Sequence, residues 1–481
     1  MFTSSLIPHA AGYWAGAFQA APGLPTFEVS DPASGEVLST LPSYGTRHTE
    51  LAIAAARNAH RPYPLAQRKA WLEAIGNALR MATPELARLI TAENGKPLEE
   101  SRGEVAYSAG FFDDAASRIH HLETHTLEAQ PRDHRWQVHH RSAGVAGLIT
   151  PWNFPLGMLA KKLAGALAAG CPVVVKPSEL TPLSCLGLFT LLDALELPKG
   201  MVNLVFGDAV AIGKALCASR DVRVLSFTGS TAVGRLLAAQ SAPTLKRLSM
   251  ELGGNAPFLV FEDADLDAAV THLMANKFRC AGQTCVCTNR VLVARPVHDA
   301  FVNRLAGEVA ALEVGAGSVE GTQVGPLIDG RGWQKVQDLV QDALEAGATA
   351  VVGGLSDPPC GAAHHFPPTV LTGVTPSMRC SREEIFGPVL AVGVFATEEE
   401  AIALANDTEY GLAAYAFSAD PERLQRVARA IHFGHVGLNS GVGPTPEAPF
   451  GGMCQSGMGR EGGLEGILEF VELQTCPTPI G

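Results

Sequence analysis

Apolar and polar residues alternate with two different periods in the first third of the chain. Residues 27–42 have a strand-like, turn-rich pattern that includes the turn sequence Asp31-Pro-Ala-Ser-Gly35. In residues 68–81 and 84–94, apolar side chains recur every three or four positions, which is the spacing of an amphipathic helix. We therefore expect a short strand region followed by long helices.

From about Gly144 the pattern changes to short apolar runs that alternate with helical stretches. The apolar runs are bounded by Gly, Pro or Asn and occupy residues 145–150, 173–175, 202–205 and 224–227. The helical stretches occupy residues 156–169, 181–195 and 209–218. Such alternation predicts βαβ units, and hence a parallel sheet with helices on both faces.

A second series of the same kind begins after Gly253-Gly254. It opens with a strand at 257–261, a helix at 266–280, a strand at 290–294 and a helix at 298–312. Further periodic segments occupy residues 333–347, 349–352, 388–395, 397–406 and 421–431. A second α/β domain is therefore expected, with its boundary near Gly253. Residues 134–140 and 466–474 are expected to be strands outside both series, able to pair within the chain or with another subunit.

The size and charge of the chain restrict its architecture and its partners. At 481 residues and 50.5 kDa it exceeds what one hydrophobic core supports, so we expect two or more domains. Only 17% of residues are charged, compared with roughly 25% in an average soluble chain, and homo-oligomerisation would explain this low fraction. The net charge is −12 and no Lys/Arg-rich run occurs, which argues against nucleic acid or an anionic membrane as a partner.

The chain shows no feature of a membrane or secreted protein. Its longest uncharged apolar stretches, residues 163–175 and 180–192, each span about 13 residues, whereas a membrane-spanning helix needs about 20. Residues 1–21 lack the basic and apolar regions of a secretory signal. The ten cysteines do not resemble a secreted disulfide framework. We expect a cytoplasmic protein with reduced thiols and no membrane contact.

Residues 278–285 end a predicted helix in a glycine-containing turn that presents Cys285. A cysteine in such a turn suits a nucleophile, although an isolated cysteine is more often structural. The nearby Cys280 and Cys287 raise the alternative of a zinc site. No second cysteine cluster or suitably spaced histidine pair accompanies them, so no metal is expected.

Two further polar residues occupy positions from which they could assist a nucleophile. Glu251 precedes two glycines, which let the backbone approach a ligand closely, and a partly desolvated glutamate can serve as a general base. An ordinary surface or helix-capping glutamate would look the same. Asn153 follows the apolar run 145–150, where an amide N–H could stabilise an oxyanion. Capping of the next helix is an equally good interpretation of Asn153.

The sequence Phe227-Thr-Gly-Ser-Thr-Ala-Val-Gly234 lies between a predicted strand and a predicted helix at 233–240. Its N–H groups and the helix dipole could face a pyrophosphate. Because it differs from the usual Gly-x-Gly-x-x-Gly pattern, it is a weak signal by itself.

Taken together, seven motifs resemble the aldehyde dehydrogenase superfamily in order and spacing over nearly the whole chain. They are Pro151-Trp-Asn-Phe-Pro, Lys176-Pro-Ser-Glu, Phe227-Thr-Gly-Ser-Thr, Glu251-Leu-Gly-Gly, Gly282-Gln-Thr-Cys285, Glu384-Ile-Phe-Gly-Pro388 and Pro449-Phe-Gly-Gly452. The resemblance implies Cys285 as nucleophile, Asn153 with the Cys285 N–H as oxyanion hole, and Glu251 as base. It implies oxidation of an aldehyde to a carboxylate through a thioester on Cys285, with NAD or NADP as oxidant.

The resemblance also implies the fold and the dinucleotide site. The expected fold is α/β, with two doubly wound domains, a Rossmann-like cofactor domain and a catalytic domain, and a small oligomerisation β-element. The expected ranges are 1–120 and 142–253 for the cofactor domain, 254–462 for the catalytic domain, and 121–141 with 463–481 for the oligomerisation strands of a homodimer or homotetramer. The residues expected to bind the dinucleotide are Trp152, Lys176, Ser178, Glu179, Gly229, Ser230, Gly234, Leu252, Glu384 and Phe386.

Glu179 bears on the choice between NAD and NADP. In the resembled family the segment that begins at Lys176 reaches the adenosine ribose. A carboxylate at Glu179 could accept from a free 2′-hydroxyl but would repel a 2′-phosphate. Two negative groups at about 4 Å repel by roughly 4 kcal/mol at an effective dielectric constant of about 20. We therefore expect NAD, with NADP as the alternative.

Residues 277–290, with the tandem Cys285-Val-Cys287, are similar to succinate-semialdehyde dehydrogenases. That resemblance implies that Arg279 binds the distal carboxylate of the substrate, a task that suits a guanidinium fork. Lys161 stands where that subfamily has a second arginine, and it would be a second substrate-binding cation without the bidentate geometry. The loop 443–449 also resembles dehydrogenases of longer oxo-carboxylate semialdehydes.

Succinate semialdehyde is therefore the first expected substrate. Glutarate or 2-oxoglutarate semialdehyde, or a broad range of aliphatic aldehydes, are the alternatives. A different class of enzyme, a thiol esterase or acyltransferase, could use Cys285, Asn153 and Glu251 without the dinucleotide site. Cys287 raises a separate hypothesis, reversible inactivation through a disulfide with Cys285, although a small buried residue is the preferred interpretation.

Overall fold

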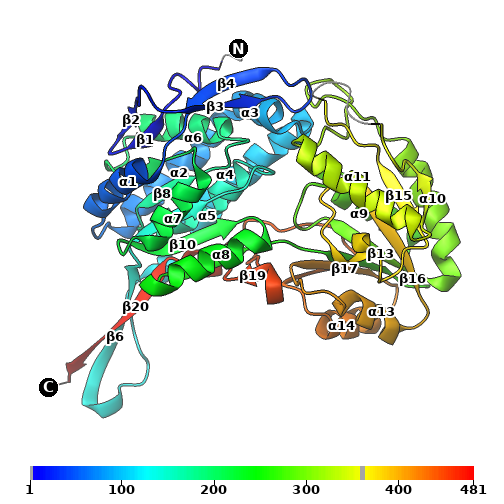
Figure 1. The fold of residues 1–481 in the computed structure, drawn as a ribbon. Coiled ribbons are helices and arrows are strands. Elements are labelled where there is room, and N and C mark those ends of the chain that lie inside the picture. Colours follow the sequence, from blue (N-terminus) through cyan, green and yellow to red (C-terminus); the bar gives the residue numbers. More distant parts are fainter. Residues whose placement is uncertain (1–3, 358–362, 481) are drawn as a thin grey trace.

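Two large sheets organise the computed structural model, which describes residues 4–357 and 363–480 (Figure 1). The first sheet has the strand order β19-β11-β10-β7-β8-β9-β1-β2, and the second has the order β14-β15-β16-β13-β12-β17-β18. Helices pack against both sheets. The α/β fold class with parallel sheets is therefore as predicted.

The first sheet is parallel at its centre and antiparallel at its edges. Its strands are β1 (Gly12–Trp14), β2 (Ala17–Gln19), β7 (Val145–Ile149), β8 (Val173–Lys176), β9 (Val202–Leu204), β10 (Val222–Thr228), β11 (Arg247–Glu251) and β19 (Gly457–Met458). Strands β7 and β8 are buried along their whole length, as apolar strands covered on both faces must be. Strand β19 pairs with β11, so the range 254–462 contributes a strand to the first sheet as well as to the second.

The direction of the chain reverses within the first sheet. The helices of this half are α1 (Thr46–Ala59), α2 (Leu65–Met81), α3 (Thr83–Asn94), α4 (Leu98–Arg118), α5 (Gly157–Ala169), α6 (Leu183–Ala194), α7 (Ala209–Ala218) and α8 (Thr231–Ser241). The chain runs from β7 through β8 to β9, returns to β10 beside β7, and then continues to β11. Right-handed crossovers therefore place α5 and α6 on one face and α8 on the other. The reversal between β7 and β10 creates a crevice at their carboxyl ends, where ligands of such sheets bind.

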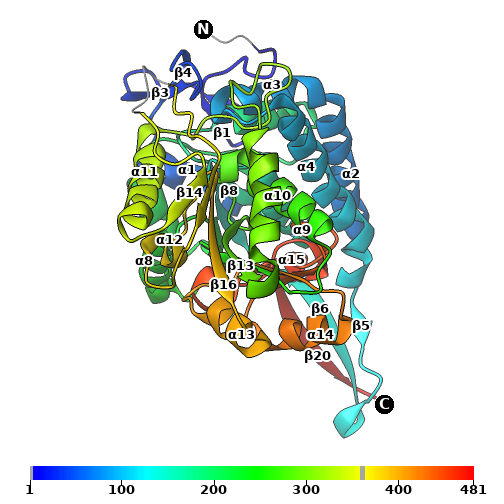
Figure 2. The same cartoon turned by 90° about the vertical axis from the view of Figure 1, so that its right-hand side faces the viewer.

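The second sheet has different helices on its two faces. Its strands are β12 (Ala256–Val260), β13 (Thr288–Ala294), β14 (Thr349–Val352), β15 (Thr369–Thr372), β16 (Val389–Phe395), β17 (Ala413–Phe417) and β18 (His435–Leu438). The helices α9 (Leu266–Lys277), α10 (His298–Ala310) and α11 (Gly330–Glu345) share one hydrophobic cluster with the sheet, and α13 (Glu398–Asn406) and α14 (Pro421–Ala430) share another. Figure 2 shows α9 and α10 side by side along this sheet, with the short helix α12 (Arg379–Arg382) beside α11.

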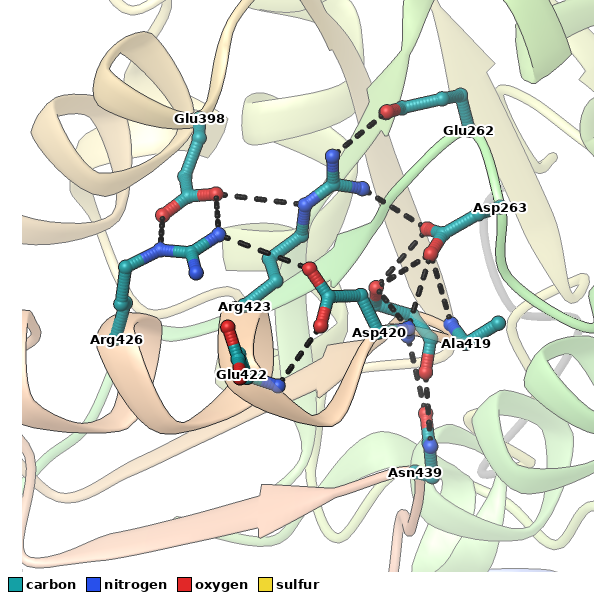
Figure 3. A network of polar contacts seen from close by, with 10 residues as sticks. Glu262, Asp263, Glu398, Ala419, Asp420, Glu422, Arg423, Arg426 and Asn439 are labelled. Carbon is teal, nitrogen blue, oxygen red and sulfur yellow. Dashed lines mark hydrogen bonds and ion pairs between the residues drawn. The ribbon is translucent and has the colours of Figure 1, made fainter.

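A network of ion pairs ties α13 and α14 to the second sheet (Figure 3). From α14, Arg423 donates to Glu262 at 2.8 Å and to Asp263 at 2.9 Å, directly after β12. Arg426 donates to Glu398 of α13 at 2.8 Å. Isolated exposed pairs contribute little to stability, but a shared network orients the helices. It lies at the carboxyl end of β12, away from the Gly253-Gly254 turn that precedes this strand.

A three-stranded sheet projects from the body of the molecule as an arm (Figure 1). In it β20 (Val471–Pro479) pairs with β6 (His134–Ser142) along its whole length, and β6 pairs with β5 (His125–Thr126). The predicted strand at 134–140 is confirmed. A separate hairpin, β3 (Thr26–Ser30) with β4 (Val37–Pro42), lies between β2 and α1 in the sequence.

The predicted strand at 466–474 is wrong in its first part. Residues Gly463–Leu468 form helix α15, and the strand begins only at Val471. Helix α15 packs closely on α5, because a Cβ atom on Gly165 would lie only 2.9 Å from the carbonyl oxygen of Gly466. This tertiary contact between two glycines overrides the local pattern of the sequence.

Candidate active site

The candidate catalytic residues come from the ends of strands in both large sheets. Strand β7 ends at Ile149 and leads to Asn153, while β11 ends at Glu251 itself. Cys285 lies in the turn that precedes β13 of the second sheet. The site is therefore built where the two sheets meet.

The turn that presents Cys285 has an unusual backbone. The predicted helix at 266–280 ends earlier, at Lys277, and is followed by Cys280 and Ala281 at φ 51° and 53°. These values lie in the left-handed region, which non-glycine residues seldom adopt and which often marks functional sites. Gly282 follows at φ 72°, and a Cβ atom there would lie 2.2 Å from the Gly387 carbonyl oxygen. Gly282 therefore permits the close approach of this turn to the segment that carries Glu384.

The thiol of Cys285 contacts Glu251 directly. Its Sγ donates to Oε1 of Glu251 at 3.0 Å. Burial raises the pKa of the Cys285 thiol well above its ordinary range, and the Glu251 carboxylate raises it further, while the Lys161 ammonium opposes both. The thiol is thus protonated at rest, and a carboxylate lies in position to accept its proton.

The second oxygen of Glu251 is held by two donors. Lys161 Nζ lies 2.5 Å from Oε2, and Thr228 Oγ1 donates to the same atom at 3.2 Å. Lys161 Nζ also lies 2.6 Å from Oε2 of Glu461, whose other oxygen pairs with Lys162. Burial would raise the pKa of the Glu461 carboxyl, but the two ammonium groups outweigh it and lower the pKa to about 2. Two lysines and two carboxylates thus form one buried, charge-balanced cluster.

Asn153 is fixed beside the nucleophile by its neighbours. Its Nδ2 donates to the carbonyl of Gln283 at 2.9 Å, which leaves a second N–H of the amide available. The backbone carbonyl of Asn153 accepts from Lys96 at 2.6 Å. Lys96 in turn pairs with Glu104 at 2.7 Å, and Glu104 accepts from the N–H groups that begin α5.

Two cavities meet at Cys285. One, of about 280 Å³, is lined by Tyr107, Phe154, Lys161, Glu251, Arg279 and Phe450. The other, of about 250 Å³, is lined by Asn153 and by six of the residues expected to bind the dinucleotide, namely Trp152, Gly229, Ser230, Leu252, Glu384 and Phe386. Cys285 and Met158 border both cavities. A ligand in each would therefore approach the same sulfur atom.

The second cavity has the features that a dinucleotide requires. Ser230 is the N-cap of α8, so the positive end of this helix dipole faces the cavity. A Cβ atom on Gly229 would lie 2.5 Å from the ring of Phe227, so only glycine keeps the backbone at this position. The rings of Trp152 and Phe386 meet edge to face at 5.5 Å and form an apolar wall. An anion site beside an aromatic wall fits a pyrophosphate next to a ring system.

Glu384 provides the acidic group of the second cavity. Its Oε1 accepts from the N–H of Gly254 at 3.2 Å. Burial raises the pKa of the Glu384 carboxyl to about 7, and the ammonium of Lys335 opposes the rise. Lys335 lines the same cavity and was not predicted. An exposed lysine on an amphipathic helix gives no signal that separates it from any other surface lysine.

Four of the residues expected to bind the dinucleotide lie outside the lining of the second cavity. Lys176 is the last residue of β8, which neighbours β7, and Ser178 and Glu179 follow it. Lys176 and Glu179 form an ion pair. Gly234 lies in α8, where a Cβ atom would clash with Leu252 at 2.4 Å. The structure thus brings six of the ten predicted residues around one cavity. The predicted contacts of Lys176, Ser178 and Glu179 with the adenosine ribose stay predictions.

Arg279 is the cation of the first cavity that has no carboxylate partner. Its guanidinium lies 5.3 Å from the ring of Phe154, and its buried Nε has no hydrogen-bond partner among the residues that the structure describes. Lys161, the second predicted substrate-binding cation, lines the same cavity but is paired with two carboxylates. Of these two cations, Arg279 is therefore the one with a donor free for an anionic ligand.

Sequence reasoning missed that Lys161 and Lys162 pair with buried carboxylates. Both lysines are buried in α5, a helix that is otherwise apolar on all sides. A buried ammonium group needs acceptors around it, so this pair of lysines was a signal that acceptors from other segments would converge on them. Nothing in the surroundings of Glu461 in the sequence identifies it as that partner.

Cys287 is buried, and its thiol donates to the carbonyl of Gly282 at 3.1 Å. This agrees with the interpretation as a small buried residue and does not test the redox hypothesis. Within residues 4–357 and 363–480, no cluster of three or more His, Cys, Asp or Glu side chains has the arrangement of a metal site. Among the same residues, no helix combines the length and apolar character needed to cross a bilayer.

The sequence matches the model of the aldehyde dehydrogenase family over residues 18–476. A mitochondrial succinate-semialdehyde dehydrogenase of Arabidopsis thaliana is 46% identical over 93% of this chain and 85% of its own length. A glutarate-semialdehyde dehydrogenase of Pseudomonas putida is 43% identical over 93% of each chain.

Solved structures resemble the whole fold. A succinate-semialdehyde dehydrogenase from Burkholderia pseudomallei has a TM-score of 0.96 and 47% identity, covering 100% of this chain and 99% of that one. An NADP-dependent enzyme from E. coli has a TM-score of 0.97 and 41% identity, covering 100% of both chains. A betaine aldehyde dehydrogenase from Staphylococcus aureus, solved in complex with NAD+, has a TM-score of 0.95 and 33% identity, covering 98% of this chain and 95% of that one. With matches over nearly its whole length, the chain belongs to the aldehyde dehydrogenase family.

Proposed function

We propose that this aldehyde dehydrogenase oxidises succinate semialdehyde to succinate with NAD. The observation that carries the proposal is Arg279, which lines the same cavity as Cys285 and forms no ion pair with a carboxylate among the residues that the structure describes. A distal carboxylate bound there would direct the aldehyde end of a short chain toward the thiol. The similarity to succinate-semialdehyde dehydrogenases supports this substrate.

The chemistry follows from the contacts of Cys285. Glu251 removes the thiol proton across the 3.0 Å contact, and the thiolate sulfur then attacks the aldehyde carbon. The second N–H of Asn153 stabilises the oxyanion that forms. The bound nicotinamide supplies the acceptor for the hydride of the former aldehyde carbon. After passing its first proton to solvent, Glu251 takes a proton from water, whose oxygen attacks the Cys285 thioester. The carboxylic acid leaves, and the Cys285 thiolate regains a proton.

The residues around the second cavity would hold the dinucleotide. Gly229, Ser230 and the start of α8 suit its pyrophosphate, while Glu384 suits the hydroxyls of the nicotinamide ribose. Glu179, paired with Lys176, favours NAD over NADP because of its negative charge.

Glutarate semialdehyde is the second candidate substrate, because a relative that acts on it is 43% identical over 93% of this chain. The deciding experiment measures kcat/KM with NAD for succinate and glutarate semialdehydes and for butanal and pentanal. We expect both semialdehydes to exceed their neutral counterparts, with succinate semialdehyde highest. A preference for the neutral aldehydes would remove Arg279 from its role. If the protein hydrolysed thiol-reactive esters but never reduced the dinucleotide, it would instead be a cofactor-independent thiol esterase or acyltransferase.

We also propose that the arm formed by β5, β6 and β20 joins copies of the chain into a homodimer or homotetramer. The arm projects from the body, and the outer edge of β20 has no partner strand among the described residues. An unpaired edge of this length is a template for pairing with another chain. In this assignment residues 121–141 and 463–481 are the assembly element, 1–120 and 142–253 the cofactor domain, and 254–462 the catalytic domain. Light scattering of a protein with proline at Leu473 should show a smaller assembly than the unmodified chain.

A further inference from the structure

The geometry points to Lys161 as a positioning residue for Glu251, holding one carboxylate oxygen of the base so that the other faces the Cys285 thiol. This role, which rests on the proposed function only in taking Glu251 as the base, differs from the binding of substrate that the sequence predicts for Lys161. It applies to every aldehyde that the enzyme oxidises, whether or not the aldehyde carries a distal carboxylate.

The two oxygens of Glu251 face different partners. Oε2 accepts from Lys161 Nζ at 2.5 Å and from Thr228 Oγ1 at 3.2 Å. Oε1 accepts from Cys285 Sγ at 3.0 Å. Three donors from three separate elements thereby fix the rotation of the carboxylate. Lys161 contributes the shortest of these contacts, and its own side chain is only 2% exposed. A buried contact of this kind orients a base before the substrate arrives.

The ammonium of Lys161 is already paired with two carboxylates and is therefore not free to bind a substrate carboxylate. Its ammonium lies between Glu251 and Glu461, at 2.5 Å and 2.6 Å, and Lys162 occupies the other oxygen of Glu461. A substrate carboxylate approaching Lys161 would meet these two carboxylates as well. The compact ammonium of lysine can donate in three directions and so join the two carboxylates between which it lies.

Several other titratable groups lie around this pair. Cys285 comes from the turn before β13, Tyr107 from α4, Lys162 from α5, and Glu461 from the segment after β19. Arg279 lines the same cavity, and Glu384 faces the pair from the second cavity. Without the Lys161 ammonium, the Glu251 carboxylate could rotate away from Cys285 Sγ, and the loss would fall on the chemical step and not on substrate binding.

The test compares Lys161→Met, which removes the charge, with Lys161→Gln, which keeps a hydrogen-bond donor. Each is assayed for kcat and KM with succinate semialdehyde and with butanal. We expect kcat to fall by about 10- to 100-fold for both aldehydes, within the contribution typical of general-base catalysis. We also expect KM for each aldehyde to change little in both variants. Lys69→Met, which removes an exposed lysine of α2, is the matched control and should behave as the unmodified enzyme.

A different pattern would overturn this role. If either variant raised KM for succinate semialdehyde while kcat and butanal oxidation stayed as in the unmodified enzyme, Lys161 would bind substrate instead. The butanal measurements keep this test independent of the substrate assignment, because they apply even if semialdehydes prove to be poor substrates. Should Lys161→Met fail to fold in thermal unfolding, Lys161→Gln decides alone through the same two readouts.

Discussion

Cys285 Sγ and Glu251 Oε1 lie 3.0 Å apart although their residues belong to different sheets. Glu251 is the last residue of β11 in the first sheet, and Cys285 precedes β13 in the second. Their contact therefore depends on how the two halves of the molecule pack together. Neither half contains a complete nucleophile and base.

The first prediction concerns Glu251→Gln, which keeps the shape of the side chain but cannot accept the thiol proton. We expect kcat/KM to fall by about 10²- to 10⁴-fold, the usual contribution of a general base. Dinucleotide reduction followed by absorbance measures it. Glu99→Gln, a change at an exposed glutamate of α4, is the control. Wild-type rates in Glu251→Gln at every pH would assign the base to another group.

The second prediction separates substrate recognition from chemistry. Arg279→Met should lower kcat/KM for succinate semialdehyde by about 10- to 100-fold, because hydrogen bonds to charged groups contribute roughly 1.5–3 kcal/mol. The loss should be much smaller for butanal, which has no carboxylate. Arg304→Met, at a half-exposed arginine of α10, controls for the removal of a surface charge. Equal losses for both aldehydes would show that Arg279 acts on the site as a whole.

The sequence predicted the central elements of both sheets because buried parallel strands have unbroken apolar runs. It missed α4 (Leu98–Arg118), whose inner face is largely formed by small residues such as Ser101, Ser108 and Ala109. Small residues carry little apolar signal, yet they let α4 pack between α2 and α5. Local periodicity therefore finds helices with large apolar side chains and misses those that depend on close packing.

In the candidate site, too, local sequence patterns identify some residues, and others depend on packing in space. Cys285, Glu251 and Asn153 could be predicted because each belongs to a short motif in a turn. Glu461 and Lys335 could not, since their importance comes from what lies next to them in space. Lys161 was predicted as a cation of the substrate cavity. That it faces carboxylates follows from the packing of α5 against β11, which no local pattern encodes.

The third prediction concerns pH and the dinucleotide. Burial raises the pKa of Glu384 to about 7, so this carboxyl is partly protonated near neutral pH. Ribose hydroxyls donate to the ionised form, and NAD should therefore bind more tightly as the pH rises through about 7. Tryptophan fluorescence quenching by NAD at several pH values measures this, since Trp152 lines the cavity. Glu384→Gln should bind NAD with an affinity that hardly changes over the same range, and a parallel pH response in that variant would contradict the role of Glu384.

The fourth prediction tests the choice of cofactor. The unmodified enzyme should have a higher kcat/KM with NAD than with NADP. In Glu179→Ala the negative charge disappears and Lys176 loses its partner, so NADP should gain on NAD by about tenfold or more. Paired steady-state measurements with both dinucleotides give this ratio. If the unmodified enzyme already preferred NADP, Glu179 would have no role in excluding the 2′-phosphate.

The last prediction concerns the stability of the site. Lys96 and Glu104 form an ion pair at 2.7 Å in which both side chains are fully buried. Glu104→Ala leaves the ammonium buried without its carboxylate and also removes the acceptor for the Leu156 and Gly157 N–H groups. We expect the free energy of unfolding to fall by about 3–5 kcal/mol, as for other broken buried pairs. Glu73→Ala, at an exposed pair on α2, should change the free energy of unfolding by less than about 0.5 kcal/mol in the same urea titration.

Because Lys96 also donates to the carbonyl of Asn153, the Glu104→Ala protein that remains folded should oxidise aldehydes more slowly with little change in KM. A stability loss no larger than that of Glu73→Ala would mean that water or another acceptor replaces the carboxylate, and that the Asn153 loop does not depend on this pair.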